Sequence, residues 1–88
     1  MASSWFVYML RCSDNSLYTG ITTNVERRIS EHNCNDKLAA KYTRVRRPVK
    51  LAYSAVCISR SEASQKEYQL KQLTKRQKEQ LVSSYRPA

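Results

Sequence analysis

The stretch LYTGITTNVERRISEH, residues 17–32, decides the predicted fold because its pattern changes from strand to helix. Aromatic and β-branched residues favour a strand over residues 17–21. Asn24 then has the side chain of a helix N-cap, whose oxygen accepts hydrogen bonds from the free amides of a first turn. We therefore predict a helix that begins at Val25 and ends near residue 33.

Gly20, the only glycine of the chain, ends the predicted strand where the chain must turn toward the helix. Because glycine has no Cβ, it tolerates a positive φ or a close approach of a phosphate backbone. We therefore expect Gly20 and Asn24 to form the turn between the strand and the helix.

Two further strands are predicted outside this stretch. Aromatic and β-branched residues predict one over residues 5–12, and the polar residues 13–16 predict the turn of a hairpin. Alternating side chains predict another strand over residues 50–57. Between residue 33 and this strand, only residues 37–40 favour a short helical turn.

Capping sequences predict two helices near the end of the chain. The letters SRSE, which begin at Ser59, have the spacing of a capping box and predict a helix over about residues 60–73. The letters TKRQ, which begin at Thr74, repeat that spacing and predict a last helix through Val82. The predicted order of elements is ββαβαα.

The length and charge bound the function. The 88 residues leave room for one domain, expected over residues 1–88 with its core at about 5–82, since separate cores normally need on the order of 100 residues each. No apolar run approaches the ~18 residues of a membrane span, and the first ten residues lack the pattern of a secretory signal, so we expect a soluble, cytoplasmic protein. The net charge of +9 favours a polyanionic partner, of which nucleic acid is the commonest.

The three cysteines argue against a disulfide framework. Cys12, Cys34 and Cys57 are odd in number and lie far apart, without the C-x-x-C spacing of a zinc site. We expect all three to be reduced and buried.

The predicted first helix places its two arginines differently. At about 100° per residue, Val25, Ile29 and His32 lie within roughly 60° of one another, Arg28 lies on the flank of that stripe, and Arg27 lies nearly opposite. Arg27 should therefore be solvated, whereas Arg28 lies one turn before His32, at a spacing where side chains meet. Both could be structural, with Arg28 covering apolar surface and His32 hydrogen-bonded within the core.

A carboxylate interrupts an apolar stripe on the next helix. Ala63, Glu67, Leu70 and Thr74 follow one another at intervals of four, three and four residues, which lines them up on one face. A buried, unpaired carboxylate costs several kcal/mol, so Glu67 needs a cation, a metal or a set of donors. The two alternatives are an ion pair with Arg28 and a metal ligand at the edge of the core.

Tyr8 and Tyr18 lie on the two strands of the predicted hairpin. Whether they share a face depends on the loop, because a shift of one residue moves a side chain to the opposite face of the sheet. We take a three-residue loop, residues 14–16, which places Tyr8 opposite Thr22 and Tyr18 opposite Cys12. Both rings then lie on one face.

These residues together match a known pattern, because the sequence resembles the GIY-YIG nuclease family. The two triplets of the family fall on FVY at residues 6–8 and YTG at residues 18–20, and the similarity runs from about Trp5 to Val82, most closely to small stand-alone bacterial members. The resemblance implies an α+β fold, a three-stranded antiparallel sheet flanked by helices, which agrees with the predicted order. Phe6 stands where the family name has its first glycine, and Ile21 stands where some repair nucleases have a lysine that contacts phosphate.

The resemblance also implies an activity, the divalent-metal-dependent hydrolysis of phosphodiester bonds in DNA by an activated water. Its catalytic residues fall on Tyr8, Tyr18, Arg28, His32 and Glu67. Glu67 would hold Mg²⁺ or Mn²⁺, and Arg28 would contact the phosphate. Tyr8 is the expected base, assisted by His32, and Tyr18 would orient the water or the phosphate, although the two tyrosines could exchange roles.

Substrate binding is expected from basic residues without obvious acidic partners. They are Lys41, Arg44, Arg46, Arg47, Lys50, Lys71, Lys75, Arg76 and Lys78. DNA is the expected ligand, with RNA as an alternative. The competing hypotheses are a nucleic-acid-binding module that performs no chemistry and an interaction protein whose basic face meets an acidic partner. Glu67 favours the enzyme, because binding alone would not require it.

Overall fold

The hairpin formed around the opening stretch is the centre of the sheet. The computed structural model describes residues 4–86, in which β1 (Trp5–Arg11) pairs antiparallel with β2 (Leu17–Thr22) on one side and with β3 (Lys50–Cys57) on the other. The strand order is β2-β1-β3. The α+β fold with a three-stranded antiparallel sheet, in the order ββαβαα, is confirmed, with one additional short helix before β3.

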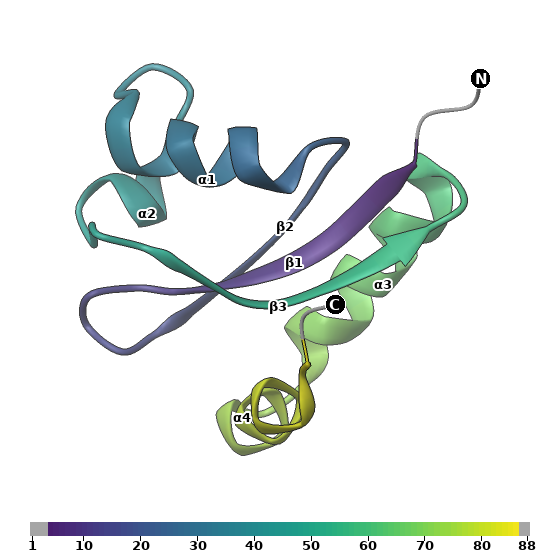
Figure 1. The fold of residues 1–88 in the computed structure, drawn as a ribbon. Coiled ribbons are helices and arrows are strands. Elements are labelled where there is room, and N and C mark those ends of the chain that lie inside the picture. The colour runs from purple at the N-terminus through teal and green to yellow at the C-terminus, as the bar shows by residue number, and fades with distance from the viewer. Residues whose placement is uncertain (1–3, 87–88) are drawn as a thin grey trace.

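The helices cover the two faces of this sheet. α1 (Val25–Cys34) and the short α2 (Lys41–Arg44) lie on one face, whereas α3 (Arg60–Gln72) and α4 (Lys75–Ser84) lie on the other (Figure 1). Within residues 4–86, no helix combines the length and the apolar composition that a membrane span requires.

Caps fix the starts of the three longer helices. The Oδ1 atom of Asn24 accepts from the amide of Arg27 at 3.0 Å, which starts α1 as predicted. Ser59 accepts from the amide three residues later, and Thr74 forms a complete capping box. The side chain and the amide of each box lie three residues apart, so these starts depend on local sequence alone.

The short helical turn predicted at residues 37–40 is present slightly earlier, where the amide of Ala39 donates to the carbonyl of Asn35 at 2.9 Å, and the separate helix α2 then begins at Lys41. The Oδ1 atom of Asn35 accepts from the amides of Lys37 and Leu38 at 2.9 and 3.0 Å. A side chain that accepts from the amides two and three residues later acts as a helix N-cap. Asn35 therefore caps a single turn at residues 36–38, which ends before α2 begins.

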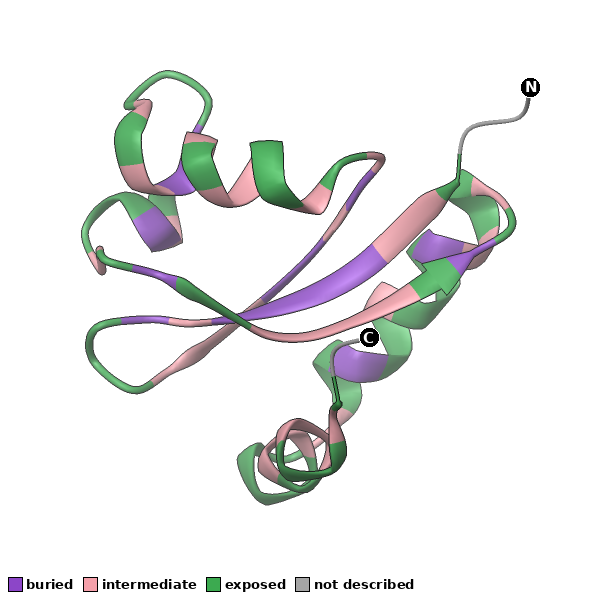
Figure 2. Ribbon diagram, in the orientation of Figure 1, coloured by how far each residue is buried: buried purple, intermediate pink, exposed green. Residues whose placement is uncertain are grey.

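β1 is buried on both faces and divides the core in two (Figure 2). Val7 and Met9 pack with buried residues of β3 and α3, whereas Tyr8 and Leu10 pack with Val49 beneath α1 and α2. Alternate side chains of a strand point to opposite faces, so a single strand supplies both cores. The tyrosine of the first family triplet lies in the core beneath α1 and α2.

The hairpin register differs from the prediction by two residues. Tyr8 lies opposite Gly20, and Tyr18 lies opposite Leu10. The loop has five residues instead of three, and the amide of Cys12 bonds the carbonyl of Ser16 across it at 2.9 Å. Because five is also an odd number, the prediction that both tyrosines share a face is confirmed although their predicted partners are wrong.

Gly20 does not form the expected turn. It lies inside β2 and has no positive φ. The ring of Tyr8 instead lies against it, and a Cβ at this position would be 2.5 Å from the Oη atom of Tyr8. The absence of a side chain is required here by a phenol ring and not by a turn.

The cysteines follow the prediction with one exception. Cys12 and Cys57 are buried and free, but Cys34 is free and exposed. Cys34 is the last residue of α1 and lies about 200° around the helix from His32, which faces the core.

Candidate active site

Three aromatic side chains meet on the face of the sheet beneath α1 and α2. Tyr8 comes from β1, Tyr18 from β2 and His32 from α1. Their ring centroids lie 6.5 Å apart for the two tyrosines, 6.1 Å for Tyr8 and His32, and 5.3 Å for Tyr18 and His32. Tyr8 and His32 are almost fully buried, whereas Tyr18 is half-buried.

A chain of hydrogen bonds assigns the tautomer of His32. The Oγ1 atom of Thr43 donates its only proton to the carbonyl of Ala40 at 3.1 Å, so it must accept from Nδ1 of His32, which lies at 2.7 Å. Nε2 of His32 is then unprotonated and accepts from the hydroxyl of Tyr8 at 2.9 Å. We assign this tautomer from its partners. The Tyr8 proton therefore already points at an acceptor.

The protonation states of Tyr8 and His32 agree with these hydrogen bonds. Burial is the main cause that lowers the pKa of His32 to about 4, together with the positive charges of Arg28 and Arg47 and against the charge of Glu31. Burial is the main cause that raises the pKa of Tyr8 to about 12, with a smaller contribution from Tyr18 and an opposing effect of Arg28. Both groups are therefore neutral at pH 7, as a phenol that donates to an imidazole must be.

Thr43 is a member of this cluster that the sequence did not indicate. It is fully buried and lies eleven residues after His32, in a segment without clear periodicity. No local pattern distinguishes it from neighbouring threonines, because its role depends on how α2 packs against α1.

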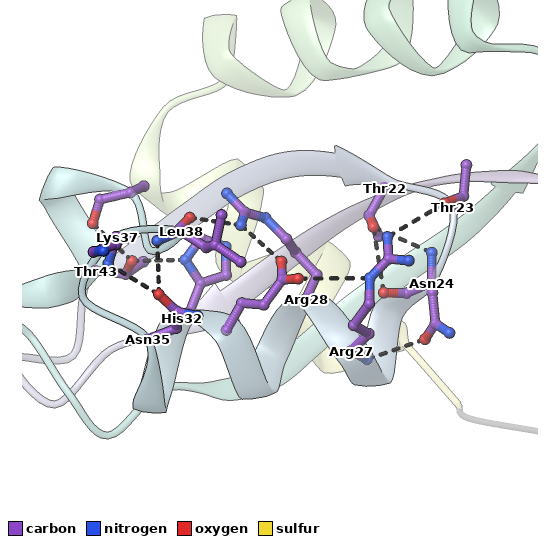
Figure 3. A network of polar contacts seen from close by, with 12 residues as sticks. Thr22, Thr23, Asn24, Arg27, Arg28, His32, Asn35, Lys37, Leu38 and Thr43 are labelled. Atoms are coloured by element: carbon purple, nitrogen blue, oxygen red, sulfur yellow. Dashed lines mark hydrogen bonds and ion pairs between the residues drawn. The ribbon is translucent and has the colours of Figure 1, made fainter.

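The two arginines of α1 differ as predicted. The side chain of Arg27 is 57% exposed, whereas that of Arg28 is 24% exposed. Nη1 of Arg28 donates to Glu31 at 3.0 Å and to the carbonyl of Leu38 at 2.7 Å (Figure 3). Its positive charge lowers the pKa of both Tyr8 and Tyr18, although burial outweighs it, so the guanidinium lies within electrostatic reach of both phenols.

The charge of Glu67 acts on the same phenols from another element, α3. This residue lies between the buried residues Ala63 and Leu70, and its charge contributes to the raised pKa of both tyrosines. The predicted alternative of an ion pair with Arg28 is not formed. Glu67 instead has Lys71 at 3.6 Å, a half-exposed partner four residues away on the same helix.

A metal ion at Glu67 would have few protein ligands. Within residues 4–86, no group of three or more His, Cys, Asp or Glu side chains could hold a metal ion. Mg²⁺ is commonly held by one or two carboxylates, with water and substrate phosphate as its other ligands. The single carboxylate of Glu67, which is 26% exposed and raises the pKa of both tyrosines by its charge, fits that mode of binding.

The predicted binding residues do not form one surface. Those on α2 and the loop after it lie on the face of α1, whereas those on α3 and α4 belong to the opposite face (Figure 1). The expectation that none has an acidic partner is wrong for four of them. The pairs are Arg46–Asp14 at 3.0 Å, Arg47–Asp36 at 2.8 Å, Lys71–Glu67 at 3.6 Å and Lys75–Glu79 at 3.2 Å.

Arg47 also has a structural task. Its Nε atom donates to the carbonyl of His32 at 2.6 Å, near the end of α1, where carbonyls lack helical partners. Five of the predicted cations have no ion pair within the described part of the chain. They are Lys41, Arg44, Lys50, Arg76 and Lys78, of which the first four are exposed.

Comparisons with known proteins give related sequences and structures. The sequence model of the GIY-YIG catalytic domain matches residues 4–80. The UPF0213 protein DP2720 of Desulfotalea psychrophila is 56% identical over 81 residues, which cover 92% of this chain and 73% of that protein.

Two solution NMR structures are also similar. The UPF0213 protein BH0048 of Bacillus halodurans has a TM-score of 0.57 and 48% identity, covering 91% of this chain and 83% of that one. The protein EF2693 of E. faecalis has a TM-score of 0.61 and 42% identity, covering 92% and 84% of the two chains.

Proposed function

The chain belongs to the GIY-YIG catalytic domain family, and from this premise we propose that it is a small endonuclease that hydrolyses phosphodiester bonds in DNA. The observation that carries the proposal is the cluster of three aromatic side chains, Tyr8, Tyr18 and His32, whose two phenols both experience the charges of Arg28 and Glu67. A structural role would account for the buried histidine, but not for a guanidinium and a carboxylate that act on the same two phenols.

Arg28 holds the phosphate in this proposal. Its guanidinium offers fixed donors to the phosphate oxygens as negative charge builds up in the transition state. Lysine at this position would keep the charge but lose the forked geometry. The bonds of Arg28 to Glu31 and to the carbonyl of Leu38 hold the side chain in place beforehand.

Tyr8 and His32 accept the proton of the attacking water as a pair. As the water oxygen bonds to phosphorus, its proton passes to the phenol oxygen of Tyr8, and the Tyr8 proton passes to Nε2 of His32. The bond between phosphorus and the leaving oxygen then breaks, and the leaving oxygen takes a proton from solvent. The 2.9 Å bond between the two side chains supports this relay, because the acceptor is already in position. Tyr18, beside both rings, orients the water or the phosphate.

Substrate binding itself prepares His32 for this step. The positive charge of Arg28 is one of the causes that lower the pKa of His32. A phosphate anion at Arg28 offsets that charge, so the pKa of His32 rises when the substrate is bound. His32 therefore becomes a better proton acceptor at the stage when a proton must be taken.

Glu67 would hold a divalent ion, Mg²⁺ or Mn²⁺. Such an ion acts as a Lewis acid that stabilises charge on the phosphate and on the leaving oxygen. Three of the exposed cations without ion pairs, Lys41, Arg44 and Lys50, would contact phosphates of the bound strand, and such contacts position the DNA without reading its sequence.

The test compares wild type with Glu67→Gln on nicked, branched, duplex and single-stranded DNA, with Mg²⁺ or Mn²⁺. Glu26→Gln is the matched control, because Glu26 is an exposed carboxylate in the first turn of α1. Cleavage by wild type and by Glu26→Gln, but not by Glu67→Gln, supports the proposal. Equal cleavage by all three would show a contaminant. Binding by all three without any cleavage would favour a nucleic-acid-binding module, and RNA is included to test its preference.

A further inference from the structure

A hollow of about 360 Å³ opens beside Arg28, at the end of the sheet where β1 begins and β2 ends. The lining includes one indole, three guanidinium groups, one carboxylate and threonine hydroxyls. Its main residues are Trp5, Thr23, Arg27, Arg28, Glu31 and Arg60. Since Arg28 lines this hollow and also belongs to the candidate active site, the hollow lies beside that site.

The charge of the hollow favours an anion. Three arginines and only one carboxylate line the hollow. That carboxylate, Glu31, forms ion pairs with Arg27 at 3.6 Å and with Arg28 at 3.0 Å. Arg60 is exposed and has no ion pair within residues 4–86. Guanidinium groups bind phosphate well because their donors match its geometry. A larger hollow of about 820 Å³ on the surface of α3 shares only Arg60 of these cations, so an anion there would find little charge.

The indole supplies a stacking surface that Arg60 covers only loosely. The guanidinium of Arg60 lies 5.8 Å from the centre of the Trp5 ring, whereas the comparable pair Arg46 and Tyr42 is closed at 3.9 Å. Arg60 is a long, exposed side chain at the start of α3, so a flat ring can displace it from Trp5. Aromatic side chains of this kind bind nucleic-acid bases by stacking, without sequence preference.

We propose that this hollow binds one unpaired nucleotide next to the phosphate at Arg28, with its base on Trp5 and its own phosphate between Arg27 and Arg60. The base must be unpaired, because both faces of a base in a duplex are covered by its neighbours. This inference rests on the proposed function and narrows its substrate to DNA that is single-stranded or has a single-stranded branch beside the cleaved bond.

The test uses the fluorescence of Trp5, the only tryptophan of the chain. Glu67→Gln protein is titrated with a short oligothymidylate, an abasic oligomer of the same length, a blunt duplex hairpin and inorganic phosphate. We expect saturable quenching by oligothymidylate, with at least about tenfold weaker binding of the abasic oligomer and of the hairpin, because one stacked base contributes that much. Inorganic phosphate should bind far more weakly and leave the emission nearly unchanged.

Charge variants test the phosphate contact separately. Arg27→Gln and Arg60→Gln should each weaken oligothymidylate binding several-fold, whereas Lys66→Gln should not. Lys66 is a matched control because it is an exposed cation on the same helix as Arg60 and does not line the hollow. Circular dichroism of each variant checks that it is folded.

Three results would overturn the inference. The first is equal binding of the abasic and the thymidylate oligomers, and the second is quenching by the duplex hairpin equal to that by oligothymidylate. The third is binding of oligothymidylate by Arg27→Gln and Arg60→Gln that is as tight as binding by Lys66→Gln. The cleavage assay separates this failure from that of the proposed function. If oligothymidylate quenches the fluorescence but the wild-type protein does not cleave DNA, the nucleotide site is supported and the proposed hydrolysis is refuted. Cleavage without quenching would remove the nucleotide site alone.

Discussion

Replacing Gly20 by alanine should destabilise the protein, because the new methyl group meets the ring of Tyr8. The Cβ would lie 2.5 Å from Oη, 2.7 Å from Cζ and 3.2 Å from Cε1 of Tyr8. Tyr8 is 1% exposed and hydrogen-bonded to His32, so the ring cannot move aside freely. Overpacking costs about 1–3 kcal/mol, and loss of the Tyr8–His32 hydrogen bond costs about 1 kcal/mol.

A smaller effect opposes this loss. Alanine restricts the unfolded chain more than glycine does, which stabilises the folded state by about 0.4–1 kcal/mol. The net expectation is a fall of about 2 kcal/mol in the free energy of unfolding, which corresponds to a Tm lower by about 10 °C in a domain of this size. Urea unfolding followed by circular dichroism measures it.

The contact itself is tested by a double-mutant cycle with Tyr8→Ala. In the Tyr8→Ala background the ring is gone, so Gly20→Ala should be neutral or slightly stabilising. An unchanged stability of Gly20→Ala in the wild-type background, or the same loss in both backgrounds, would refute the packing argument. In the cleavage assay, the displaced Tyr8 should also lower activity.

Three further predictions follow from the site. Arg28→Ala should lower cleavage at saturating substrate by about 10²–10³-fold, since it removes donors to the transition state. Arg27→Ala should weaken only the binding of DNA. Equal losses of turnover in the two variants would contradict the role of Arg28 at the phosphate. Thr43→Val leaves the Nδ1 proton of His32 buried without an acceptor, so this variant should lose about 1–3 kcal/mol of stability and cleave more slowly. Thr43→Ser should restore both stability and cleavage. If ¹⁵N NMR shows the same His32 tautomer in Thr43→Val and its activity is unchanged, the relay is contradicted. The pKa of His32 falls from 6.5 to about 4 on folding, so between these pH values the unfolded state binds a proton that the folded state does not, and stability is lost as the pH falls. The loss, up to about 3 kcal/mol at pH 4, should be absent from His32→Gln in denaturant titrations, and parallel pH profiles of the two proteins would count against it.

Much of the site could be predicted where its residues share one element. The helical angle separates Arg28 from Arg27, and the same geometry places His32 on the buried face, because both depend only on the helix repeat. The spacing of Glu67 between Ala63 and Leu70 likewise follows from one helix. Helical spacing also contains the observed partners, because Glu31 lies three residues after Arg28 and Lys71 lies four residues after Glu67.

Of the four ion pairs that the predictions missed, Lys71–Glu67 and Lys75–Glu79 have the i, i+4 spacing of one helix and could have been found, whereas the two pairs of Arg46 and Arg47 join residues that are distant in sequence. Arg46 pairs with Asp14, 32 residues away, and Arg47 bonds the carbonyl of His32, 15 residues away. A count of acidic residues near each cation cannot find such pairs, since loop conformation brings them together.

The sequence by itself determined the elements and their order, because caps such as Asn24 and Thr74 and the strand and helix periodicities act over a few residues. Tertiary structure alone decided that Tyr8 lies over Gly20 and that the hydroxyl of Thr43 accepts a hydrogen bond from Nδ1 of His32. The first depends on a loop of five residues, which sets the register, and the second on the packing of α2 against α1. These contacts join different elements of the fold, so no local pattern encodes them.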